Sequence, residues 1–276
     1  MSYGLFLVTM IGIPITVLFV LLTIDTIAYT RRKRLRSMEQ GERFFWKMLV
    51  LLVGIAFVYT TPWDNYLVRN GVWYYDPALV SGIVWGWVPI EEYMFFILQT
   101  VLVGLWMAWL NRIHSKRMED KGHFLPIAGV STGALKGRLC ALCLLLLLWF
   151  MALGLFLRGG SAWMYTSLIL LWALPPLMLQ IGFGGDLLSH KRRFLFWAIA
   201  VPTVYLWIAD TLAITSGTWT IDPAHSLQLY LPGGLPVEEA LFFLMTTILI
   251  AFGLTLATMP AAQERLMALG IHRFKR

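Results

Sequence analysis

Charged side chains are scarce in this chain of 276 residues: they make up 13% of it, whereas hydrophobic residues make up 59%. Soluble domains carry about 25% charged residues, so this composition excludes the soluble class and is typical of a polytopic membrane protein. Seven apolar stretches have the length of about 20 residues that crosses a bilayer as a helix, and we expect an all-α fold. The predicted spans are approximately residues 4–28, 48–66, 84–110, 139–157, 162–184, 195–214 and 236–258.

Cysteine and histidine are too few and too scattered to indicate metal or redox chemistry. The two cysteines, Cys140 and Cys143, both fall in the fourth apolar stretch, without histidine companions or a βαβ context. We therefore predict two buried small hydrophobic residues and no metal site. The histidines lie in loops and the tail, which excludes a di-iron cluster: His114, His123, His190, His225 and His272.

Two further absences exclude other classes of membrane protein. The last span, 236–258, contains no lysine, so it offers no Schiff-base site for retinal. The chain also has no Asp-rich run of the kind with which a prenyltransferase would bind magnesium.

The net charge of +7 comes from basic residues that are concentrated in four places. Twenty of the 22 lie in 31–47, 112–138, 191–193 and 265–276, which seven spans put on one side of the membrane. The positive-inside rule then predicts a cytoplasmic C-terminus and an outside N-terminus, with a retained first span in place of a cleaved signal peptide. Attraction to anionic lipid accounts for the charge, and we predict no nucleic-acid partner.

The chain repeats itself at a distance of 146 to 147 residues. We predict two parallel three-helix repeats, 1–111 and 159–259, joined by a basic loop and linking helix at 112–158 and followed by a basic tail at 260–276. The first copy contains Asp64, Gly71, Trp73, Asp76, Pro77, Pro89-Ile90-Glu91-Glu92, Phe95-Phe96 and Thr100. The second contains Asp210, Gly217, Trp219, Asp222, Pro223, Pro236-Val237-Glu238-Glu239, Phe242-Phe243 and Thr247.

Each copy places two adjacent glutamates at the start of an apolar helix. Pro89 and Pro236 fit the first helical position, so each glutamate pair falls in the first turn. Adjacent helical residues point about 100° apart, so we expect one acid of each pair to work and the other to support it.

Paired acids in membrane helices are costly, which favours a functional interpretation. Apolar burial favours the protonated carboxyl group and a helix N-terminus favours the carboxylate, so a group held between them can exchange protons. Aspartates near these glutamates would accept a proton or tune the donor: Asp64, Asp76, Asp210 and Asp222. Aromatic neighbours, including Trp63, Trp73, Trp85 and Trp87, would stabilise a developing cation. Helix capping and an interfacial aromatic belt are the structural alternatives, but the set occurs twice.

The motif Pro-x-Glu-Glu-x-x-Phe-Phe at the head of a membrane helix follows an Asp-containing helix end and a Gly-x-Trp loop. It resembles the lycopene cyclases built from two three-helix units, which occur as separate subunits in some bacteria. In archaea, other bacteria and fungal bifunctional proteins the units are fused, and this chain resembles the fused form in both repeats.

The resemblance implies carotenoid biosynthesis by cyclisation of lycopene ends to β-ionone rings, without oxidation or reduction. It implies acid and base roles for Glu91, Glu92, Glu238 and Glu239, among which we favour Glu92 and Glu239 as donors, with Asp64 and Asp210 beside them. The substrate-binding candidates are aromatic: Trp73, Tyr93, Phe95, Phe96, Trp219, Phe242 and Phe243. No flavin or other cofactor is expected, because the dinucleotide fingerprint is absent.

The expected partners are the carotenoid and the bilayer, with a second copy of the chain or other carotenoid enzymes as further candidates. The chain can bury its site between its own repeats or pair with another copy. Repeat two has Asp210-Thr211-Leu212 where repeat one has Pro62-Trp63-Asp64-Asn65-Tyr66, so the repeats are not expected to be equivalent. The sequence leaves open whether one or both ends are cyclised, whether the substrate is C40 or C50, and which ring type forms. A small 3-1-3 transporter is the main alternative, although the acids lie near one membrane face.

Overall fold

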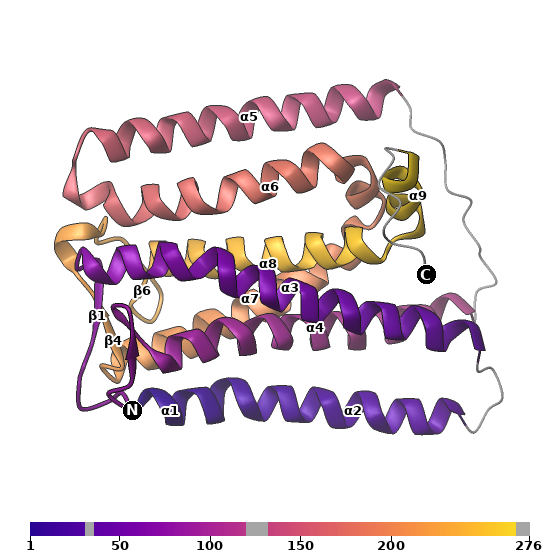
Figure 1. Ribbon diagram of the computed structural model, residues 1–276, viewed down its shortest axis with the longest axis horizontal. Coiled ribbons are helices and arrows are strands. Elements are labelled where there is room, and N and C mark those ends of the chain that lie inside the picture. The colour runs from indigo at the N-terminus through magenta and orange to yellow at the C-terminus, as the bar shows by residue number, and fades with distance from the viewer. Residues whose placement is uncertain (31–35, 120–131, 269–276) are drawn as a thin grey trace.

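The computed structural model describes residues 1–30, 36–119 and 132–268, and it is almost wholly helical (Figure 1). Parts of the predicted basic loops and tail, at 31–35, 120–131 and 269–276, lie outside the described residues. The prediction of seven spans is confirmed, because the described part of the chain holds seven helical segments long and apolar enough to cross a membrane. They are Tyr3–Ile27, Gly41–Arg69, Ile90–His114, Leu135–Leu157, Ser161–His190, Arg192–Thr215 and Val237–Thr258.

The helices follow one another along the chain, with strands between α3 and α4 and between α7 and α8. They are α1 (Tyr3–Phe6), a π-helical turn (Leu7–Gly12), α2 (Ile13–Thr30), α3 (Arg36–Arg69), α4 (Ile90–Glu119), α5 (Thr132–Leu157), α6 (Met164–His190), α7 (Arg192–Thr215), α8 (Val237–Thr258) and α9 (Pro260–Ala268). Short 3-10 turns occur at Ser161–Trp163 and Pro223–His225. The strands are β1 (Trp73–Tyr75), β2 (Val84–Trp85), β3 (Val88–Pro89), β4 (Trp219–Ile221), β5 (Tyr230–Leu231) and β6 (Leu235–Pro236).

The third span begins later than the predicted residue 84, because residues 84–89 form the hairpin β2–β3. Gly86 turns this hairpin at φ +67°, and a Cβ there would meet Asn65 Oδ1 at 2.2 Å. The placing of Pro89 and Pro236 at the first helical position is also wrong by one residue. Pro89 ends β3, and Pro236, with ψ 140°, precedes α8 as its cap.

Helices α4 and α8 lie in the centre of the bundle and begin at the same end of it (Figure 1). Each packs against the second helix of the other predicted repeat, α7 on α4 and α3 on α8. Between them, Gln99 Nε2 donates to Thr246 Oγ1 at 2.7 Å, and these two residues are 147 positions apart. The division into repeats stays a prediction, but corresponding residues face each other along this central contact.

Helix α5 packs along the outer side of α6 at the edge of the bundle (Figure 1). Its cysteines, Cys140 and Cys143, are exposed there, so the prediction that they are buried is wrong. An edge helix of a membrane protein turns apolar side chains outward to lipid, and small thiols are accommodated on that face.

The strands β1 and β4 pair antiparallel at the end of the bundle where α4 and α8 begin. Trp73 faces Ile221, Tyr74 faces Thr220 and Tyr75 faces Trp219. One strand comes from each predicted repeat, and Asp222 N–H donates to Val72 O at 2.9 Å beside them. The β1–β4 pair therefore joins the two predicted repeats next to the first turns of α4 and α8.

Ion pairs lie at the opposite end of the bundle. Asp25 pairs with Arg112 at 3.6 Å, and Asp186 pairs with Arg265 at 2.7 Å and with Arg138 at 3.1 Å. These ion pairs connect α2 to α4 and join α5, α6 and α9. Asp25 and Asp186, on the first helix of each predicted repeat, therefore stabilise helix packing and lie away from the glutamate pairs.

Candidate active site

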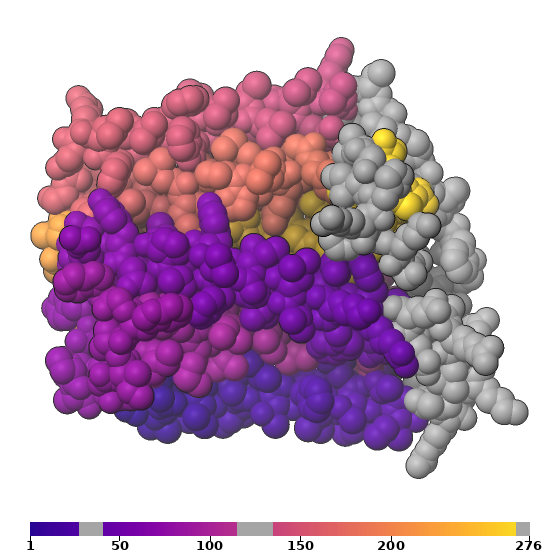
Figure 2. Space-filling view, in the orientation of Figure 1, coloured from indigo at the N-terminus to yellow at the C-terminus, as the bar shows by residue number. Residues whose placement is uncertain are grey.

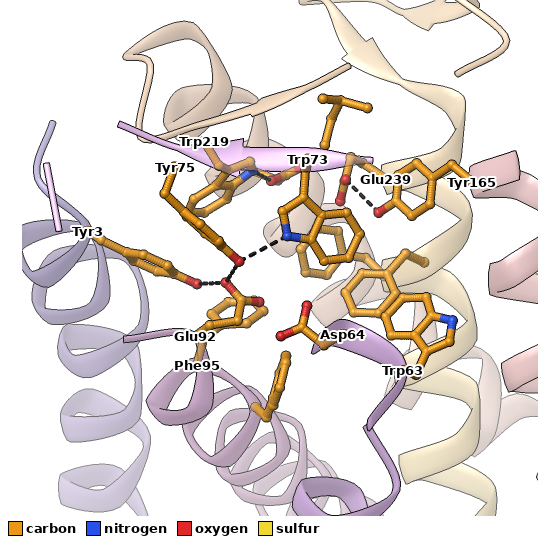
Figure 3. Close-up of a pocket in the computed structure, with 15 residues that line it drawn as sticks. Tyr3, Trp63, Asp64, Trp73, Tyr75, Glu92, Phe95, Tyr165, Trp219 and Glu239 are labelled. Atoms are coloured by element: carbon orange, nitrogen blue, oxygen red, sulfur yellow. Dashed lines mark hydrogen bonds between the residues drawn. The ribbon is translucent and has the colours of Figure 1, made fainter. Parts of the chain in front are cut away.

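Where α4 and α8 begin, a small cavity of about 30 Å³ lies under β1 and β4 (Figure 3). This volume holds about two water molecules. Acids and aromatic side chains from both predicted repeats line it: Tyr3, Trp63, Asp64, Trp73, Tyr75, Glu92, Phe95, Phe96, Tyr165, Asp210, Trp219, Ile221, Glu239, Phe242 and Phe243.

The two glutamates of each pair point in different directions from the first turn of their helix. Glu92 and Glu239 line the cavity. Glu91 and Glu238 instead accept backbone N–H bonds, each at 2.6 Å, from Ser81 and Leu227 in the preceding loops. The 100° offset between adjacent residues thus separates a cavity-facing acid from one that fastens the loop.

Tyrosine hydroxyls hold the two cavity glutamates. Glu92 Oε2 accepts from Tyr3 at 2.5 Å and from Tyr75 at 2.9 Å (Figure 3). Glu239 Oε1 accepts from Tyr165 at 2.7 Å. Desolvation, followed by the charge of Glu92, raises the pKa of Tyr75 well above its usual value, so this phenol remains a hydrogen-bond donor.

The two aspartates of the cavity have different surroundings. Both are buried, at 0% exposure for Asp64 and 1% for Asp210. Asp210 Oδ1 accepts from Trp219 Nε1 at 3.1 Å, whereas neither oxygen of Asp64 has a hydrogen-bond partner among the described residues. The corresponding indole, Trp73, donates to the Tyr75 hydroxyl at 3.0 Å, and repeat two has Ile221 in place of that tyrosine.

The sequence segments that carry these acids are similar to known proteins. The model of the family described as lycopene cyclase matches residues 5–110 and 162–257, one segment in each predicted repeat. The chain belongs to the lycopene cyclase family. The lycopene beta-cyclase of Halobacterium salinarum is 36% identical over 220 residues, which are 78% of this chain and 84% of that protein.

Fungal relatives of the lycopene cyclase family are longer proteins. The bifunctional lycopene cyclase/phytoene synthase of Arthroderma gypseum is 37% identical over 209 residues, 75% of this chain but 35% of that protein. The corresponding protein of Aspergillus oryzae is 37% identical over 214 residues, covering 77% and 34%. No solved structure matches the chain.

Six of the seven aromatic candidates line the cavity of this family member: Trp73, Phe95, Phe96, Trp219, Phe242 and Phe243. Tyr93 does not, because it follows Glu92 by one residue and points away. Its hydroxyl accepts from Asn65 Nδ2 at 2.8 Å and donates to Trp85 O at 2.7 Å. Trp85 and Trp87 are more than half exposed and also lie outside the cavity.

The loop aspartates are turn residues rather than members of the site. Asp76 Oδ1 accepts from Ala78 N–H at 2.9 Å, and Asp222 Oδ1 accepts from Ala224 N–H at 2.8 Å. The expectation that they tune the proton donor is therefore corrected: each closes a local turn outside the cavity.

Three tyrosines of the cavity were not among the sequence candidates: Tyr3, Tyr75 and Tyr165. Tyr3 and Tyr165 stand near the starts of the first and fifth spans, a correspondence that aligning these weakly similar helices would have shown. Their rings also cross between halves. Tyr3 packs on Trp219 with centroids 5.0 Å apart, and Tyr165 packs on Trp73 at 5.3 Å.

Proposed function

We propose that this chain is a lycopene β-cyclase that converts linear ψ end groups to β-ionone rings by proton-initiated cyclisation. The observation that carries the proposal is the convergence of four acids from both repeats in one aromatic-lined cavity: Asp64, Glu92, Asp210 and Glu239. Ionisable groups inside membrane helices are expensive and mark functional sites. The family and the relatives named above support the same activity.

The proposed reaction adds one proton and removes one. A carboxylic acid gives its proton to the terminal double bond of the ψ end, which leaves a tertiary carbocation. The neighbouring alkene attacks this cation and closes the ring, and a carboxylate then takes a ring proton so that the double bond re-forms. No electrons are gained or lost, so the proposal requires no redox cofactor.

The hydrogen bonds favour Asp64 as the donor and Glu92 as the acceptor. Two phenols donate to Glu92 Oε2 and stabilise a carboxylate there. Neither oxygen of Asp64 accepts a hydrogen bond from the described residues, so its carboxyl group can keep its own proton without losing one. This assignment differs from the sequence-based prediction that Glu92 is the donor. Glu239 and Asp210 complete the polar lining of the cavity in which the carbocation forms.

Aromatic faces supply the rest of the cation's surroundings. The cavity side chains Trp73, Phe95 and Phe242 present π faces and ring edges and no base that could trap the cation. The apolar walls also limit water, which would add to the cation and give an alcohol.

We further propose that the site is complete within one chain embedded in lipid, with the cavity towards the outer face. Exposed apolar side chains such as Phe19 (59%) and Leu147 (68%) support lipid contact at the edges of the bundle. A C-terminal fluorescent protein fusion should be bright and a C-terminal alkaline phosphatase fusion inactive. The reverse pattern would contradict this orientation.

Pigment chromatography of a lycopene-accumulating bacterial host that expresses the chain tests the activity against an empty-vector control. The expected result is conversion of lycopene to monocyclic γ-carotene, bicyclic β-carotene or both. Unchanged lycopene, with the protein detected in the membrane, would contradict the proposal and direct attention to a C50 substrate.

A further inference from the structure

A long apolar groove runs between α3 and α6 on the outer surface of the bundle (Figure 2). Its volume is about 1010 Å³. Val50, Gly54 and Val58 line it from α3, and Leu168, Leu171 and Trp172 line it from α6. Between Val50 and Trp63 an α-helix rises about 20 Å, so the groove follows much of the membrane-spanning length.

One residue, Trp63, belongs to the walls of both the groove and the acid cavity. Its ring stacks on Trp172 on the groove side, with centroids 4.8 Å apart, and on Phe242 on the cavity side at 5.5 Å. Its Nε1 donates to Leu168 O at 3.0 Å. The Trp63 indole thus separates the two spaces, while the repeat-two position that corresponds to it holds Ala209.

The two spaces differ greatly in volume. The cavity of about 30 Å³ is too small for a branched hydrocarbon end group, whereas the groove is large and open. An end group that reaches Asp64 and Glu92 from the groove side must displace the Trp63 ring. One hydrogen bond and three ring contacts, to Trp73, Trp172 and Phe242, hold that ring. Turning one side chain to another rotamer is a faster and more local motion than separating whole helices.

We propose that the groove between α3 and α6 holds the polyene chain of the linear carotenoid, and that its end group enters the acid cavity past Trp63. This inference rests on the proposed function. A polyene has no polar atoms, and the only hydroxyl on the described groove wall, Tyr59, already donates to Trp172 O at 2.8 Å. The stacked indoles offer flat π faces to a conjugated chain.

Filling the groove at Gly54 tests the proposal. A Cβ at Gly54 meets nothing within 4 Å, so Gly54→Phe should fold and project its ring into the groove. Gly154→Phe is the matched control, because Gly154 is an equally open helical glycine on α5, away from the groove. In the lycopene-accumulating host, Gly54→Phe should lower the ratio of cyclised carotene to lycopene about tenfold, equivalent to about 1.4 kcal/mol. Gly154→Phe should match wild type.

The outcomes separate the two proposals. If the wild-type chain leaves lycopene unchanged, the proposed function fails and the groove assignment fails with it. If wild type cyclises lycopene and Gly54→Phe does so as well as Gly154→Phe, the groove assignment alone is overturned.

Photocrosslinking locates the polyene without depending on catalysis or on a blocked groove. Benzoylphenylalanine at Val58, which is 70% exposed and lines the groove, should give a lycopene adduct on irradiation. The same label at Leu147, which is 68% exposed on α5, reports lycopene dissolved in the lipid. An adduct yield at Val58 no higher than at Leu147, or adducts of phospholipid acyl chains alone, would overturn the proposal.

Discussion

At the scale of single residues, the site is asymmetric although its sequence repeats. Tyr75 is the residue that creates the difference, because it takes the Trp73 N–H and gives a second hydroxyl to Glu92. Ile221 stands at the corresponding position, so the Trp219 N–H reaches Asp210 instead. One exchange between tyrosine and isoleucine thus gives four similar acids four different sets of partners.

The phenol of Tyr3 should contribute directly to the reaction. Tyr3→Phe removes one of the two donors to Glu92 but keeps the ring on Trp219. A hydrogen bond to a charged group contributes about 1.5–3 kcal/mol, so cyclisation should fall about 10- to 100-fold. Tyr93→Phe removes a hydroxyl outside the cavity and should keep wild-type pigment ratios; equal losses in both variants would indicate a packing effect only.

Glu92→Gln separates the acceptor role from the donor role. With Asp64 intact the cation still forms, but the base that takes the β-ring proton is gone. We expect less cyclised product, with ε or γ end groups in place of part of the β rings, as measured by chromatography and NMR of the pigments. Wild-type yields of pure β rings would rule out Glu92 as the acceptor.

The sequence predicted much of this site because acids in apolar helices are conspicuous, and the 146-residue repeat marked the same ones twice. It did not place Tyr3 or Tyr165, because a tyrosine near the start of a membrane helix is as readily an interfacial residue. Whether Tyr93 or Phe95 reaches the cavity depends on the helix start, and a shift of one residue rotates every side chain by about 100°.

At the scale of elements, hairpins before α4 and α8 fix where the glutamates lie. The loops donate backbone N–H groups to Glu91 and Glu238, and glycines at positive φ close turns before α4, including Gly82 (+80°) and Gly86 (+67°). These short strands interrupt apolar segments, so composition alone extended the third span back to residue 84. The pairing of β1 with β4 joins residues 144 to 148 positions apart, which no local pattern specifies.

The hairpin β2–β3 should not tolerate a side chain at its turn. Gly86→Ala adds both a positive-φ penalty of about 1–2 kcal/mol and a Cβ at 2.2 Å from Asn65 Oδ1. Gly82→Ala adds only the first, because its Cβ meets nothing within 4 Å. The apparent Tm of the detergent-solubilised protein should therefore fall more for Gly86→Ala; equal Tm values would contradict a role for this close approach.

At the scale of the whole molecule, the family's two-unit composition has a direct structural meaning. The acids of both repeats share one cavity, and rings from each half pack on the other half. Family members that exist as two subunits would need both to complete such a site. Seven spans and a membrane class followed from hydropathy alone, whereas the contact of α3 with α8 and of α7 with α4 depends on how the two halves interlock.

A shared cavity processes one end group at a time. The substrate must leave and re-enter with its other end, so the monocyclic carotene should accumulate before the bicyclic one. A time course of pigments after induction measures this order. Bicyclic product that rises from the first time point without a monocyclic precursor would contradict a single shared cavity.

Asp64, a buried acid without a hydrogen-bond partner among the described residues, starts the proposed reaction, and one comparison of pigments tests this role most directly. Asp64→Asn keeps the size of the side chain and removes its proton, while Asp76→Asn makes the same change at the turn outside the cavity. In the lycopene-accumulating host, with both variants at wild-type levels in the membrane, Asp64→Asn should leave lycopene uncyclised and Asp76→Asn should yield β rings as wild type does. Cyclisation by Asp64→Asn at the wild-type rate would contradict the account.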